Sequence, residues 1–125
     1  MSADEVRLAV PAAPEYARIA RLTVSGLATR LGFTYDEVED LRIAVGEACS
    51  LLLGPGGREG TLTLVYGLSP DAIAIEAIGD FTDGDADDRT EAAGLTDQIL
   101  TAVVDEHEVD DAGWRVRLVK RRAGG

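Results

Sequence analysis

The chain has 125 residues, the size of one domain, and 23 acidic against 12 basic residues give it a net charge of −11. This balance argues against non-specific nucleic-acid binding and against an anionic membrane surface, because both need clustered Lys and Arg. Cys49 is the single cysteine, so an internal disulfide is excluded. Neither a signal-peptide pattern nor an apolar run of the ~20 residues that span a membrane is present, and we expect a cytoplasmic protein.

The first half of the chain predicts a strand and a helix. Residues 6–10 alternate between apolar and polar side chains, which indicates a short strand that Pro11 ends. Residues 14–31 repeat apolar side chains at three- and four-residue spacing, which indicates a helix. Gly32 follows at the position where glycine commonly caps a helix C-terminus.

The clearest local signal starts the next helix. Thr34 is followed three residues later by Glu37, the pattern of a capping box. An apolar stripe at helical spacing continues behind it, so we predict a helix over 35–53. Gly54-Pro55-Gly56-Gly57 ends this helix, because glycine and proline disfavour its continuation.

The second half is dominated by period-two patterns, which are typical of strands. The expected order is a strand at 61–66, a connection at 67–71, a strand at 72–76, a polar loop at 79–90, a helix at 91–104, a strand at 106–109, a turn at 110–113, a strand at 114–119 and a disordered tail at 121–125. This order predicts a single domain, residues 1–125, ordered over about 5–120. Its fold class is α+β, a two-layer sandwich with a mainly antiparallel sheet and helices on one face.

One segment carries a family resemblance. Residues 39–50 read E-D-L-R-I-A-V-G-E-A-C-S and resemble a conserved helix motif of the bacterial anti-sigma-factor and serine-protein-kinase family. Further matches follow the family's order at residues 14–21, Gly94-Leu95, 104–109 and 116–120. The resemblance spans about residues 5–120, is closest to degenerate actinobacterial members, and implies the histidine-kinase/Hsp90-type ATPase fold.

The resemblance also implies partners. Members of the family act as dimers that bind a sigma factor, and standard members phosphorylate a serine of an anti-anti-sigma factor with ATP and Mg²⁺. We therefore expect a sigma factor, an anti-anti-sigma factor and a second copy of the chain as partners. Because family members contact partners through the first helix, Arg18 and Arg21 are the candidate contact residues.

The resemblance places a catalytic base and a metal ligand on the second helix. The general base of the family corresponds to Glu47, which is retained. The asparagine that helps to hold Mg²⁺ four residues later corresponds to Leu51. A leucine offers no oxygen, whereas Mg²⁺ requires oxygen ligands in near-octahedral geometry.

The rest of the implied nucleotide site is changed in the same direction. The aspartate that binds adenine corresponds by register to Ala77, and Asp80 could replace it only through a local insertion. The family's lid sequence G-L-G-L is reduced to Gly94-Leu95-Thr96. The second glycine is thus lost from a place where backbone must approach phosphates closely.

These residues predict an anti-sigma factor that acts by sequestration, with no resident metal and, at most, vestigial ATP and Mg²⁺ binding. The alternative is an active serine kinase with a repaired site that uses Asp80 and Ser50. A third hypothesis is an adaptor that binds anti-anti-sigma proteins alone. Residue by residue, Glu47 is also compatible with a solvated helix position, Cys49 with a small buried hydrophobe and His107 with a satisfied strand residue.

Overall fold

The computed structural model describes residues 4–82, 90–110 and 114–123, and the side chains of residues 90–92 lie outside that description. The elements in chain order are β1 (Asp4–Pro11), a 3-10 turn (Pro14–Tyr16), α1 (Ala17–Leu31), α2 (Tyr35–Leu53), β2 (Gly60–Leu68), β3 (Ala72–Phe81), α3 (Thr90–Val103), β4 (Glu106–Asp110) and β5 (Arg115–Arg121). The three helices and all five strands predicted from the sequence are therefore present. The expected loop over residues 83–89 and turn over 111–113 lie outside the described residues.

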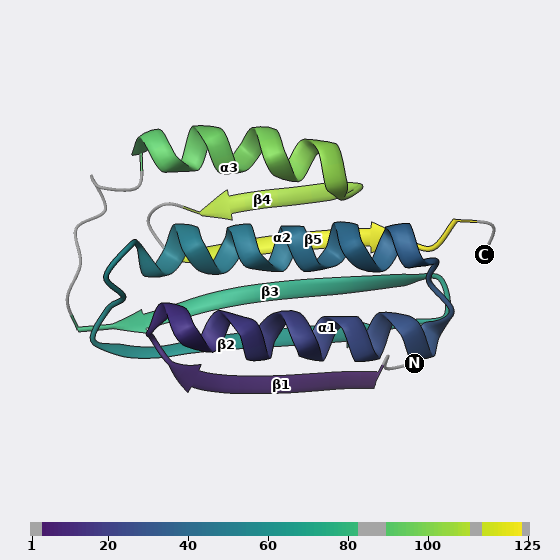
Figure 1. The fold of residues 1–125 in the computed structure, drawn as a ribbon, viewed down its shortest axis with the longest axis horizontal. Coiled ribbons are helices and arrows are strands. Elements are labelled where there is room, and N and C mark those ends of the chain that lie inside the picture. The colour runs from purple at the N-terminus through teal and green to yellow at the C-terminus, as the bar shows by residue number, and fades with distance from the viewer. Residues whose placement is uncertain (1–3, 83–89, 111–113, 124–125) are drawn as a thin grey trace.

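The strands form a five-stranded antiparallel sheet in the order β1-β2-β3-β5-β4. All three labelled helices lie over the same face of this sheet, with α2 between α1 and α3 (Figure 1). This arrangement confirms the α+β two-layer class. Strand alternation then divides the side chains into a set that faces the helices and a set on the open face.

Several strands extend further than their sequence patterns predict, and β3 and β5 continue into segments expected to be loop or tail. β3 continues through Gly79 and Asp80 to Phe81, where a loop was expected, because β2 begins early enough to pair with it: Gly60 lies opposite Phe81. Gly60 has a φ of 139°, and a Cβ there would collide with the backbone of Asp80. A glycine therefore permits this close approach of the two strands.

β5 likewise continues to Arg121, where we expected a disordered tail to begin. The next residues are fixed by hydrogen bonds: Arg122 N donates to Asp71 O (2.6 Å), and Ala123 N donates to Glu37 Oε2 (2.7 Å). These partners are distant in sequence, so no local pattern could predict the order of residues 121–123.

Glu37 joins the start of α2 to the end of the chain. The capping box is confirmed, since Glu37 N donates to Thr34 Oγ1 (3.2 Å) and Thr34 N donates to Glu37 Oε1 (2.7 Å). The hydrogen bond from the Thr34 backbone lowers the pKa of Glu37 although burial of the carboxyl opposes this shift. A charged carboxylate here satisfies donors of both α2 and the segment after β5.

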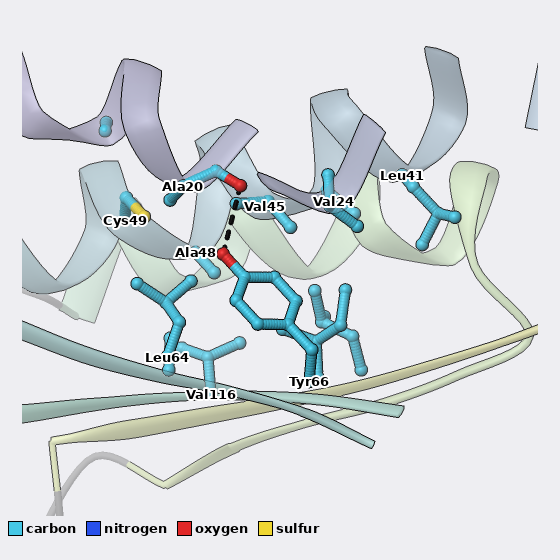
Figure 2. Close-up of a cluster of buried hydrophobic side chains, with 14 of the residues drawn as sticks. Ala20, Val24, Leu41, Val45, Ala48, Cys49, Leu64, Tyr66 and Val116 are labelled. Atoms are coloured by element: carbon cyan, nitrogen blue, oxygen red, sulfur yellow. Dashed lines mark hydrogen bonds between the residues drawn. The ribbon is translucent and has the colours of Figure 1, made fainter. Parts of the chain in front are cut away.

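The core lies between the helices and the sheet. Its largest fully buried side chains come from all three helices and from β2, β3 and β5, among them Val24, Leu41, Leu52, Leu64, Tyr66, Ile75, Leu100 and Leu118. Tyr66 points from β2 toward α1, and its hydroxyl donates a buried hydrogen bond to Ala20 O at 3.0 Å (Figure 2). Burial raises the pKa of Tyr66, so the phenol stays protonated and serves as a donor.

Among the described helices, none combines the length and the apolar character that crossing a bilayer requires. This agrees with the sequence, in which no apolar run of that length occurs.

We predict that Tyr66→Phe lowers the free energy of unfolding by about 1–2 kcal/mol, because it removes one buried hydrogen bond while leaving the ring in place. Urea denaturation followed by circular dichroism measures this change. Tyr35→Phe is the matched control, since Tyr35 is 79% exposed and its loss of a hydroxyl should change stability by less than about 0.5 kcal/mol. Equal effects of the two substitutions would contradict the role of the Tyr66 hydroxyl.

Candidate functional site

A groove runs between α1 and α2 on the side of the helices that faces away from the sheet. It has a volume of about 370 Å³. The α1–α2 groove is lined by Arg21, Glu39, Arg42, Ile43, Gly46, Glu47 and Ser50. The structure thus brings together Glu47, Ser50 and Arg21, which the sequence pointed to as catalytic, nucleotide-binding and partner-binding residues respectively.

Arg21 extends from α1 across α2. A Cβ built on Gly46 would lie 3.5 Å from Arg21 Cδ and 3.6 Å from Arg21 Nη1, so the arginine side chain lies directly over this glycine. Across the described part of the chain, Arg21 has no ion pair or side-chain hydrogen bond. Its five N–H donors are therefore available to an external acceptor.

Two other charged groups of the groove, Arg42 and Glu39, already form an ion pair with each other. Arg42 Nη1 donates to Glu39 Oε1 at 3.0 Å, one helical turn apart on α2. Glu47 is half-buried and Ser50 is exposed. The groove therefore presents one free guanidinium, one open carboxylate and a hydroxyl. Arg18 is exposed on α1 just before the groove but does not line it.

Leu51 and Ala77 lie inside the hydrophobic core rather than at a binding surface. Leu51 is 3% exposed and Ala77 is 1% exposed. Leu51 is one turn beyond Glu47 on α2, yet its side chain joins the buried cluster. Neither residue has an oxygen donor in its side chain, so the residues present at these positions do not fit a magnesium–nucleotide complex.

Asp80 cannot take the place of Ala77. The pairing of β2 with β3 is continuous from Gly60 to Leu68, so the local insertion that Asp80 would need is absent. Along β3, Ala77 faces the helices, and Asp80, three residues on, lies on the open face of the sheet. The structure therefore separates Asp80 from Glu47 and Ser50, in contrast to the repaired site that the alternative hypothesis requires.

The lid positions fall within a regular helix. Gly94, Leu95 and Thr96 belong to α3, and Gly94 has no positive φ. Gly94 and Leu95 are exposed, whereas Thr96 is 4% exposed and faces inward. The backbone amides here are committed to helical bonding, so this segment does not form the open glycine loop that cradles phosphates.

Several polar contacts fix α3 in this position. Asp97 Oδ1 lies 2.6 Å from His107 Nε2 and links α3 to β4. Lys120 Nζ donates both to Asp40 Oδ2 (3.0 Å) and to Val103 O (2.9 Å), which joins β5 to α2 and to the end of α3. His107 is thus a satisfied strand residue, and the described residues contain no group of three or more His, Cys, Asp or Glu placed to bind a metal.

Cys49 is a buried core residue. Burial raises the pKa of its thiol to about 12, and the nearby Arg21 charge opposes part of this shift. A protonated, enclosed thiol is chemically inert at neutral pH. The influence of Arg21 on Cys49 agrees with an arginine side chain that lies against α2.

Sequence reasoning missed the role of Arg58. Its Nε donates to Leu52 O (3.1 Å) near the end of α2, and its guanidinium lies 4.7 Å from the ring centroid of Trp114. Trp114 in turn packs edge-on against Phe81, with 5.2 Å between ring centroids. Phe81 and Trp114 pack against the core, and Arg58 joins them to the end of α2. No local sequence pattern links these three residues.

Comparison with known proteins places this geometry in a family. The model of the histidine kinase-like ATPase domain matches residues 10–120. The serine-protein kinase RsbW of Bacillus subtilis is 33% identical over 95% of this chain and 86% of its own length. RsbW of Bacillus pumilus is 32% identical over 94% of this chain and 85% of its own length. The chain therefore belongs to the histidine kinase-like ATPase domain family and is an RsbW-like member of it.

Proposed function

We propose that this protein is an anti-sigma factor that binds and sequesters a sigma factor without phosphorylating a partner. The observation that carries the proposal is the contrast between the α1–α2 groove and the position that follows Glu47 on α2. The surface around Arg21 in the α1–α2 groove is open and has free donors. The position four residues after Glu47 is closed, because Leu51 is part of the core.

Charge supports a protein partner over a nucleotide. With a net charge of −11, the chain repels a free triphosphate at long range. The α1–α2 groove carries Arg21 and Arg42 beside Glu39 and Glu47, and Arg21 has no ion pair with a described residue. Ile19, Leu22 and Ile43 are 41%, 60% and 46% exposed on the same two helices. Arginine combined with exposed apolar side chains is the usual composition of a protein interface.

The proposal includes an anti-anti-sigma factor that competes for the complex, and assembly as a homodimer. The relatives are named serine-protein kinases, and we infer that this member retains their partner binding rather than their catalysis. If no sigma factor binds, the remaining hypothesis is an adaptor that binds anti-anti-sigma proteins alone. Light scattering of the free protein measures the dimer directly.

We predict that partner binding does not depend on nucleotide. The purified protein, mixed with each alternative sigma factor of its own genome, should form a complex on size exclusion with the same affinity with and without Mg-ATP. Incubation with Mg-[γ-³²P]ATP and an anti-anti-sigma factor should give no labelled product, since Leu51 and Ala77 supply no ligands. Incorporation of phosphate would instead support the kinase alternative.

Charge reversal in the groove should disrupt the complex. We expect Arg21→Glu to weaken sigma-factor binding at least ~10-fold, because it replaces a free donor with a repelling carboxylate. Calorimetry measures the affinity, and Arg18→Glu tests the neighbouring candidate. Arg30→Glu is the matched control, since Arg30 is exposed on α1 outside the α1–α2 groove. Unchanged binding by Arg21→Glu would remove Arg21 from the interface.

Restoring the metal ligand should not restore the nucleotide site. We predict that Leu51→Asn lowers the free energy of unfolding by about 2–4 kcal/mol, because it removes buried apolar volume and places an amide in the core. It should gain no Mg-ATP binding by calorimetry. Leu95→Asn, at a 61% exposed position, should change stability by less than about 0.5 kcal/mol. A stable Leu51→Asn variant that binds Mg-ATP would show that the site is intact.

A further inference from the structure

Gly46 is an unexpected residue in its position. It lies in the interior of the 19-residue helix α2, where glycine is less favourable than alanine. Its φ is not positive, so the backbone conformation does not require glycine. The space beside Gly46 shows what a small residue at this position permits.

That space holds the side chain of Arg21. Cδ and Nη1 of Arg21 are the heavy atoms nearest to the position of a Cβ on Gly46, at 3.5 Å and 3.6 Å. These distances are ordinary van der Waals contacts, so an alanine fits, whereas a side chain as large as leucine would compete with Arg21 for the space beside α2. By contrast, a Cβ on Gly26 or Gly94 in the other helices meets nothing within 4 Å.

We propose that Gly46 is a positioning residue that seats Arg21 across α2 and presents its guanidinium, already extended, to a carboxylate of the partner protein. This inference rests on the proposed function. Arg21 is half-buried, and its Cδ and Nη1 lie beside Gly46 of α2, a contact that reduces the side-chain entropy lost on binding. The planar guanidinium suits a bidentate carboxylate contact.

The surroundings define the partner chemistry further. Ile43 is 46% exposed in the same groove, and Glu39 already pairs with Arg42. Arg21 is therefore the free cation of the groove within the described residues, and an apolar contact lies on the same surface. The matching partner segment carries an aspartate or glutamate adjacent to an apolar side chain.

A double-mutant cycle between Gly46 and Arg21 tests the inference. Sigma-factor affinity is measured by calorimetry for Gly46→Ala, Gly46→Leu, Arg21→Ala and the double variant Arg21→Ala/Gly46→Leu. We expect Gly46→Ala to bind within twofold of the natural protein and Gly46→Leu to bind ~10-fold more weakly. In the Arg21→Ala background, Gly46→Leu should cause no further loss beyond twofold. Gly26→Leu, in α1 outside the groove, is the control for a leucine placed at an exposed helical glycine.

If Gly46→Leu weakens binding equally in both backgrounds, it acts by direct obstruction and the positioning role is overturned. A second readout does not depend on the partner. Nuclear Overhauser contacts between the Arg21 δ-protons and the Gly46 α-protons should be present in the free protein and lost in Gly46→Leu. Their absence from the natural protein would show that Arg21 does not lie against Gly46, and the positioning role would be overturned. If the contacts are present but no sigma factor binds, the proposed function and the proposed binding of a partner carboxylate are both wrong. The placement of Arg21 against Gly46 is then still correct.

Discussion

The sheet is covered by helices on one face only, and this constraint decides which side chains can meet α2. Strand alternation places Ala77 under the helices and Asp80 on the other side of the sheet. On that open face Glu76 forms an ion pair with Arg115 of β5 at 3.3 Å. A carboxylate of β3 could therefore face the helices only from a position of the same parity as Ala77. Glu76 and Asp80 both have the opposite parity, so the alternation places the two acidic side chains on the open face, away from α2.

The three helices share one face of the sheet, and specific polar contacts hold α3 beside α2 in this layer. Lys120 supplies one, because its ammonium, with a side chain 13% exposed, binds both Asp40 of α2 and the Val103 carbonyl of α3. His107 and Asp97 supply another at the β4 side. A nearly buried ammonium is unfavourable unless it is paired and hydrogen-bonded. Lys120 meets both conditions through Asp40 and the Val103 carbonyl. These contacts join α3 to α2 and to β4.

Local signals accounted for most of the fold. The capping box of Thr34 and Glu37 gave the start of α2, and period-two patterns gave the strands. The ends of β3 and β5 were mispredicted because long-range pairing overrides turn-forming composition there. Gly79 N, for example, donates to Trp114 O at 2.8 Å, a partner 35 positions away that no window of sequence reveals. Propensity is a weak prior wherever a neighbouring strand supplies the hydrogen bonds.

The candidate site was predictable as separate residues but not as an arrangement. Glu47 and Arg21 each stood out by resemblance, yet the register of α1 against α2, which places Arg21 over Gly46, is a tertiary property. The burial of Leu51 was also not predictable from the sequence, since a leucine four residues after Glu47 could have faced solvent. Leu51 is 3% exposed, and its burial contributes to the stability of the fold. The fold therefore favours an apolar side chain at Leu51, whereas Arg21 has no ion pair with any described residue that would stabilise the fold. A free arginine seated on a glycine that weakens its own helix is best explained by a partner outside the chain.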